Sequence, residues 1–80
     1  GYYNIMIHLN KGVGLNIIGE LLISYRKLHA ITQQSLAEAL SHHSNHFKAL
    51  NSVTLSRWET GVTTPSLAKK KGILGFLSSS

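Results

Sequence analysis

The sequence NSVTLSRWETG, residues 51–61, predicts one short helix with both of its ends marked. Asn51 suits the N-cap because its side-chain oxygen can accept a hydrogen bond from a free backbone N–H of the first turn. Leu55 and Trp58 are three residues apart and therefore share a face, which we expect to be buried. Gly61 suits the position after the last turn, where a positive φ is favoured. The exposed first turn of this helix contains Ser52, Val53 and Thr54.

Two further segments with helical periodicity precede this helix. Residues 17–29 place apolar side chains at intervals of three and four, and Asn16 can cap the segment. Residues 32–40, TQQSLAEAL, predict a second helix with Thr32 as its cap. The expected buried residues of this second helix are Leu36, Ala37 and Leu40.

Residues 63–77 predict a last helix. Thr64 can cap it, and Pro65 suits its first turn because the missing N–H of proline would have no partner there. Two glycines each weaken this helix by roughly 1 kcal/mol relative to alanine. The side chains that can bury a face are Leu67, Ala68, Ile73, Leu74, Phe76 and Leu77. The chain is therefore expected to be all-α, a small bundle of four to five helices.

Residues 1–15 have a different pattern. Apolar and polar side chains alternate over residues 2–9, which is the period of a short β-strand, and residues 10–14, NKGVG, end the pattern. A single strand is unstable without a pairing partner. We therefore expect either a strand that pairs with a second copy, as a dimer contact, or a disordered leader. Residues 16–80 form the one predicted domain.

The composition restricts the class of function. The chain has 80 residues, which is enough for one small domain, and its eight Lys and Arg against three Asp and Glu give a net charge of +5. This excess favours a polyanionic partner, either nucleic acid or an anionic membrane surface. No apolar run approaches the roughly 20 residues that span a bilayer. Cysteine is absent, which fits a cytoplasmic protein, and the scattered acidic residues offer little catalytic chemistry. We expect no enzyme and no cofactor.

Residues 18–77 resemble the lambda-repressor/Cro-like helix-turn-helix family, also called the XRE family. Residues 18–40, IGELLISYRKLHAITQQSLAEAL, are similar to the first two helices of that family, and TLSRWETG, residues 54–61, is similar to its recognition helix with the glycine stop. TTPSL, residues 63–67, is similar to the entry of the next helix. The fifth helix that is usual in the family has no evident counterpart here.

The resemblance implies a sequence-specific DNA-binding transcriptional regulator, a repressor that binds a two-fold-related operator as a homodimer. The recognition helix of such a motif lies in the major groove of double-stranded DNA. There Arg57 can form a bidentate pair with guanine and Val53 can contact a thymine methyl group. The full set of expected base contacts is Ser52, Val53, Thr54 and Arg57.

Other residues of the family pattern have supporting roles. Expected phosphate contacts are Gln33, Thr63, Thr64 and Lys69, with the lysine run that Lys69 begins adding unspecific attraction. Arg26 and Glu59 match an internal ion pair of the family, which would hold the first helix against the recognition helix.

The insertion SHHSNHFK, residues 41–48, lies between the two helices that define the motif, and Ala49 replaces the turn glycine of the family. Three alternatives account for it. Its histidines have the helical spacing of metal ligands, but no Asp, Glu or Cys is near them in the sequence, so we expect no metal site. A pH-sensitive surface is the second alternative. The third is structural and is the one favoured by the spacing of four, three, four and three in the set Leu36, Leu40, His43, Phe47 and Leu50.

In the structural alternative the insertion extends the second helix or adds a short helix, with Phe47 as its anchor. A longer second helix would change how the recognition helix meets DNA. The rival class of function is accordingly a protein-interaction module, such as an antitoxin or a regulatory adaptor, that uses the same fold and binds a protein partner through the insertion or the N-terminal strand.

Overall fold

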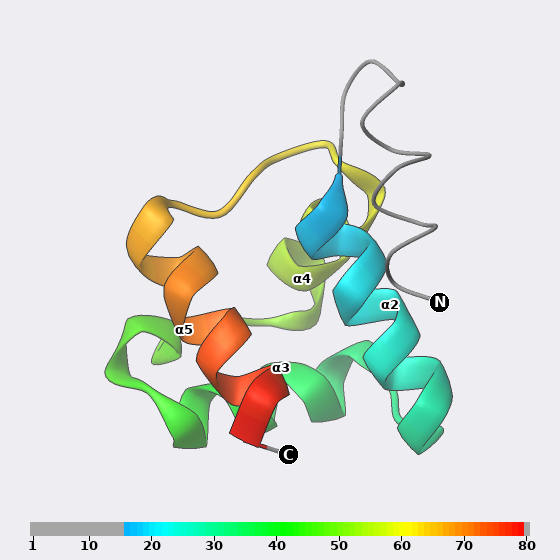
Figure 1. The fold of residues 1–80 in the computed structure, drawn as a ribbon, viewed down its shortest axis with the longest axis horizontal. Helices are drawn as coiled ribbons and strands as arrows, with labels where there is room; N and C mark the ends of the chain where they lie inside the picture. Colours follow the sequence, from blue (N-terminus) through cyan, green and yellow to red (C-terminus); the bar gives the residue numbers. More distant parts are fainter. Residues whose placement is uncertain (1–15, 80) are drawn as a thin grey trace.

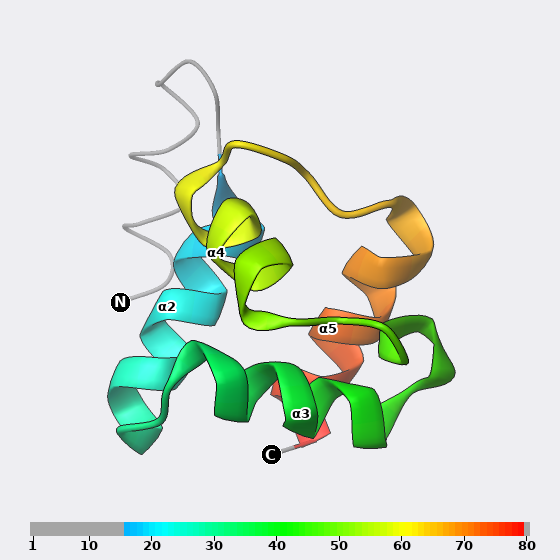
Figure 2. The same ribbon diagram turned by 180° about the vertical axis from the view of Figure 1, so that it is seen from behind.

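The structure is a computed structural model that describes residues 16–79, and the regular structure within that range is entirely helical. Its elements are α2 (Ile17–His29), α3 (Gln33–His43), the short 3-10 helix η1 (Asn45–Phe47), α4 (Ser52–Thr60) and α5 (Leu67–Ser79). In Figure 1, α2 and α5 lie nearest the viewer, and in the reverse view of Figure 2, α3 and α4 do. The expected all-α bundle is confirmed, whereas the strand predicted at residues 2–9 lies outside the described residues.

Helix α2 has the bounds that the sequence predicts, and its start is tied to α4. The Asn16 side chain accepts a hydrogen bond from the Gly19 N–H (3.3 Å), as expected of a cap, and it also donates to the Glu59 carbonyl oxygen (2.9 Å). A Cβ added at Gly19 would lie 2.5 Å from the Trp58 carbonyl oxygen. The glycine therefore permits the close crossing of α2 over the end of α4.

The insertion both extends a helix and adds one. Thr32 caps α3, which continues three residues past its predicted end to His43. Ser44 then takes an extended conformation, with φ −150° and ψ 141°, and its hydroxyl accepts the His46 N–H (3.2 Å) at the start of η1. The expected anchor is confirmed, because Phe47 is 1% exposed. The chain thus reverses after α3 and does not continue as one straight helix.

The start of α5 differs from the prediction. The helix begins at Leu67, and the Ser66 hydroxyl accepts the Lys69 N–H (3.3 Å), so the cap expected at Thr64 is wrong. Residues 61–66 instead form the connection that crosses the top of Figure 1 from α4 to α5. Pro65 is buried within this connection. Because these residues are needed to cover the distance between the helices, α5 starts later than its local sequence signals suggest.

The core receives side chains from every helix. Its buried apolar members are Leu22, Leu36, Ala37, Leu40, Phe47, Leu55, Trp58 and Ile73. Two residues of α5 that were expected to be buried, Leu67 and Leu74, are 69% and 48% exposed, and Ala68 is exposed as well. The side of α5 that faces the core carries Gly72, whose added Cβ would lie 2.9 Å from the Phe47 ring. The insertion and α5 are therefore packed directly against each other.

Candidate nucleic-acid interface

Helix α4 presents a short, capped face to solvent. The Asn51 side chain accepts the Thr54 N–H (2.9 Å), and Gly61 ends the helix with φ 81°, so both predicted ends are confirmed. Burial of Leu55 and Trp58 turns the opposite face outward, where Val53 is 55% exposed. The expected base-contact residues divide accordingly: Val53 and Arg57 are exposed, whereas Ser52 and Thr54 are half-buried.

An ion pair between the half-buried Arg26 and the buried Glu59 holds α4 in place. The Arg26 Nε atom lies 2.7 Å from Glu59 Oε2, and Arg26 Nη2 lies 2.9 Å from Glu59 Oε1, so the expected pair is present and bidentate. Glu59 is 4% exposed. The hydrogen bond to Glu59 raises the pKa of Arg26 above its usual value, burial opposes this rise, and the carboxylate charge adds to it. The guanidinium also donates to the Ile31 carbonyl oxygen (3.3 Å), which connects α4 to the turn between α2 and α3.

Gln33 completes this network. Its side-chain nitrogen donates to Glu59 Oε1 (3.0 Å), an internal contact that the sequence analysis did not predict. The phosphate contact expected of Gln33 stays a prediction, and the second N–H of the amide is the donor that would make it. The first residue of α3 is thus joined to the last turn of α4.

The residues expected to meet phosphates beyond α4 lie beside it. The Thr63 N–H donates to the Arg57 carbonyl oxygen (3.3 Å), and both Thr63 and Thr64 are exposed in the connection to α5. The Lys69 Nζ atom is 5.9 Å from the centroid of the Trp58 ring, a cation–π distance. The structure therefore brings Thr63 and Lys69 close to the helix that carries Arg57.

Sequence reasoning did not find several residues that shape this site. The glycine in IIGE, residues 17–20, was the only local signal for the α2–α4 crossing that Asn16 and Gly19 make. Ser66 is the cap of α5, although TTP, residues 63–65, contains a stronger local cap pattern.

The histidines of the insertion lie on the surface. His42, His43 and His46 are exposed, and the His43 ring meets the edge of the Phe76 ring, with centroids 5.5 Å apart. Across residues 16–79, no group of three or more His, Cys, Asp or Glu side chains is arranged to hold a metal ion. The contact with Phe76 gives His43 a packing role against α5.

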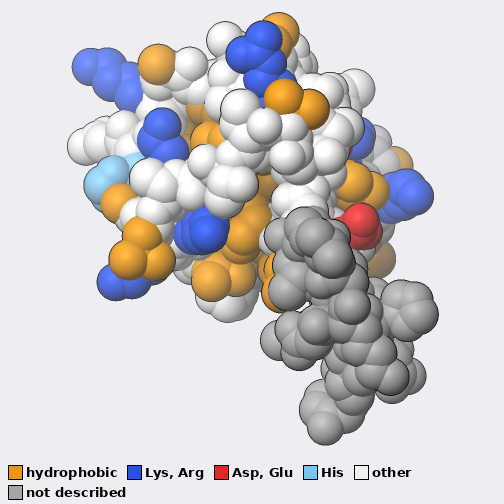
Figure 3. All heavy atoms as spheres, turned by 90° about the horizontal axis from the view of Figure 1, so that it is seen from above, with side chains coloured by type: hydrophobic (Ala, Val, Ile, Leu, Met, Phe, Trp, Pro, Cys, Tyr) orange, Lys and Arg blue, Asp and Glu red, His pale blue; other side chains and the backbone are white. Residues whose placement is uncertain are grey.

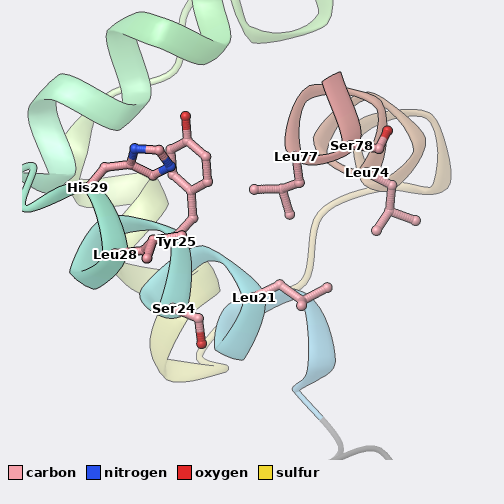
Figure 4. A pocket seen from close by; sticks show the side chains of 8 residues that line it. All are labelled: Leu21, Ser24, Tyr25, Leu28, His29, Leu74, Leu77 and Ser78. Carbon is pink, nitrogen blue, oxygen red and sulfur yellow. The ribbon is translucent and has the colours of Figure 1, made fainter. Parts of the chain in front are cut away.

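An apolar groove opens between α2 and α5 (Figure 4). It has a volume of about 370 Å³. In the close-up, Leu21 and Tyr25 project from α2 and face Leu77 across the groove. Leu28, one of the periodic apolar side chains of residues 17–29, is 79% exposed at this site. The full lining is Leu21, Ser24, Tyr25, Leu28, His29, Leu74, Leu77 and Ser78.

Two findings complete the description of the chain. Within the range that the structure describes, none of the helices has the length and apolar character needed to cross a membrane. No family model, curated protein or solved structure matches this chain.

Proposed function

We propose that the chain is a sequence-specific DNA-binding domain of a transcriptional regulator, a repressor that acts in the cytoplasm, without catalysis, as a homodimer on a two-fold-related operator. The observation that supports this proposal best is the way α4 is held. Its exposed face carries Val53 and Arg57, whereas its one acidic residue, Glu59, is buried and paired with Arg26. Such a helix can enter the negatively charged major groove without an exposed carboxylate to repel the phosphates.

The spacing on α4 supports direct contacts with bases. Val53 and Arg57 are four residues apart, so they lie one turn from each other on the same face. A guanidinium can pair with O6 and N7 of guanine, and a valine can pack against a thymine methyl group. Ser52 and Thr54, in the first turn, add hydroxyl groups that can bond to several bases.

Contacts with the phosphate backbone would fix the register of α4. Thr63 and Thr64 are exposed in the connection that follows α4, and the Lys69 ammonium group lies over the Trp58 ring. With Gln33 at the start of α3, these residues flank the recognition helix from the segments before and after it. Contacts of this kind contribute affinity and orientation, whereas the bases provide sequence specificity.

The test is selection of bound sequences from a random pool of double-stranded DNA at two salt concentrations. A two-fold-related motif is the expected result, and its half-site spacing would report the dimer. The selected site then serves to compare Arg57→Ala with Lys27→Ala, a matched loss of an exposed cation on α2. Arg57→Ala should weaken binding by roughly 5- to 150-fold and relax the preference for one base pair, because a good bidentate contact contributes about 1–3 kcal/mol. Absence of any enriched motif, or equal effects of the two variants, would contradict the proposal.

The groove between α2 and α5 favours a second candidate function, a protein-interaction module. The groove is lined mostly by leucine and tyrosine side chains, so the matching partner would be the apolar face of a helix from another protein. Leu28→Ser changes this groove without touching α4 and separates the two functions. If the chain is chiefly an interaction module, this variant loses its partner while Arg57→Ala keeps it. If the chain is a DNA-binding regulator, Arg57→Ala loses DNA affinity and Leu28→Ser keeps it.

A further inference from the structure

One aromatic contact joins the insertion to the proposed DNA-binding unit. The rings of Phe47 and Trp58 meet edge to face, with centroids 6.4 Å apart, so η1 lies beside α4. The same Phe47 ring lies against the backbone of α5 at Gly72. The insertion, the proposed recognition helix and the middle of α5 are therefore held together at one place in the core.

Three basic residues are connected to this contact, two of them by their place in the chain and one by a direct contact. Lys48 directly follows Phe47 and is exposed, and Arg57 directly precedes Trp58 and is also exposed. The Lys69 ammonium group lies over the face of the Trp58 ring. The segments that meet at the Phe47–Trp58 contact thus each carry a basic residue: Lys48 after η1, Arg57 on α4 and Lys69 on α5.

Acidic side chains are segregated from this region. Residues 41–79 contain one acidic residue, Glu59, and it is buried in the ion pair with Arg26. The exposed carboxylates in the described range are Glu20 on α2 and Glu38, which accepts a hydrogen bond from Gln34 on α3. In Figure 3, the view from above, Lys and Arg side chains lie at several points of the face, and the acidic colour appears in one place.

We propose that the insertion is part of the DNA interface, with Lys48 and Lys69 forming a track for the phosphate backbone beside the recognition helix. This inference rests on the proposed function and extends it to residues that the helix-turn-helix pattern lacks. An extended polyanion is the partner that matches this charge distribution, since the exposed charges from η1 to α5 are all positive. The reversal at Ser44 brings η1 back beside α4, where Phe47 meets Trp58, so that Lys48 follows directly after a residue packed against the proposed recognition helix.

Salt dependence measures the phosphate contacts directly. Each phosphate neutralised on B-DNA contributes about 0.9 to the slope of log affinity against log salt. Lys48→Gln and Lys69→Gln should therefore each reduce the slope by about 0.9, with the same loss of affinity on every DNA sequence. Lys48→Arg keeps the charge and should keep the slope. Lys27→Gln, the matched loss of a cation on α2, should also leave it unchanged.

The failures of the two proposals are distinguishable. If the wild-type chain binds DNA and Arg57→Ala weakens binding, but Lys48→Gln leaves the slope unchanged, the track is wrong and the proposed function stands. If Lys27→Gln reduces the slope as much as Lys48→Gln does, the effect is one of net charge and the track is equally wrong. If the wild-type chain binds no DNA, both proposals fail together. Far-UV circular dichroism of each variant checks that the fold is intact.

Discussion

Gly72→Ala should stabilise the chain in a background that lacks the Phe47 ring, but not in the wild type. In the wild-type chain, the added Cβ would lie 2.9 Å from Cε2 and 3.0 Å from Cζ of Phe47, closer than van der Waals contact allows. The Phe47 ring is buried and makes an edge-to-face contact with the Trp58 ring, so it has little room to move. In a Phe47→Ala background the ring is absent and the new methyl group enters the space that it leaves.

The magnitudes follow from two opposing contributions. Replacing glycine by alanine inside a helix stabilises the folded state by about 1 kcal/mol. Overpacking of a well-filled core costs about 1–3 kcal/mol, so Gly72→Ala should be neutral or should destabilise the wild-type chain by about 2 kcal/mol. In the Phe47→Ala background the overpacking is absent, and only the stabilisation from the helix propensity of alanine remains. The coupling energy between the two positions is therefore about 1–3 kcal/mol.

The assay is urea unfolding, followed by the fluorescence of Trp58, the one tryptophan of the chain, and by far-UV circular dichroism. Phe47→Ala alone should cost about 3–5 kcal/mol, a large share of the roughly 4–12 kcal/mol expected for 80 residues. Phe47→Leu therefore provides a milder second background, which also lacks the Cε2 and Cζ atoms.

Gly75→Ala is the control on the same helix. The nearest atom to its added Cβ is His43 Nε2 at 3.8 Å, an ordinary contact, so it should stabilise every background by up to about 1 kcal/mol. Effects of Gly72→Ala that agree within about 0.5 kcal/mol in all backgrounds would refute the packing of the insertion against α5.

Three further predictions concern the Arg26–Glu59 ion pair and the end of α2. Arg26→Ala should lower the free energy of unfolding by about 3 kcal/mol, because it leaves the buried Glu59 carboxylate without its bidentate partner; a loss below about 1 kcal/mol in urea unfolding would count against this role. Ala30→Gly should raise the free energy of unfolding by roughly 0.5–1 kcal/mol, because Ala30 has φ 54° and glycine takes that conformation without strain; thermal unfolding measures it, and an unchanged or lower midpoint contradicts it. The pKa of Arg26 is raised in the folded state, so the stabilisation by this group is fully present below its unfolded pKa. It is lost only as the pH rises through the higher folded pKa. The free energy of unfolding should therefore gain no pH dependence from Arg26 between about pH 6 and 9. A coupling energy between Arg26 and Glu59 that changes across this range in double-mutant cycles would show otherwise.

Much of the candidate site was predictable because its parts are local. Arg57 and Val53 share a face because residues four apart on a helix are separated by about one turn. Their exposure follows from the burial of Leu55 and Trp58 on the other side of the same helix. The partner of Gln33 was not predictable, because it depends on the Glu59 carboxylate arriving from a helix 26 residues further along the chain.

The sequence by itself determined where most helices begin and end. Asn16, Thr32 and Asn51 each cap the helix predicted for them, because a cap is a hydrogen bond between neighbours and needs no tertiary partner. Gly61 ends α4 for an equally local reason, its tolerance of a positive φ.

Only the tertiary structure decided the path of the insertion, the late start of α5 and the exposure of its leucines. Periodicity showed that Phe47 belongs to an apolar stripe, but not that Gly72 would provide the space for its ring. Helical spacing likewise allowed Leu67 and Leu74 to be buried, and the side of α5 that meets the core left them exposed. These outcomes depend on how segments that are far apart in the sequence pack against each other. That packing, and not the local pattern, decides which side chains are buried.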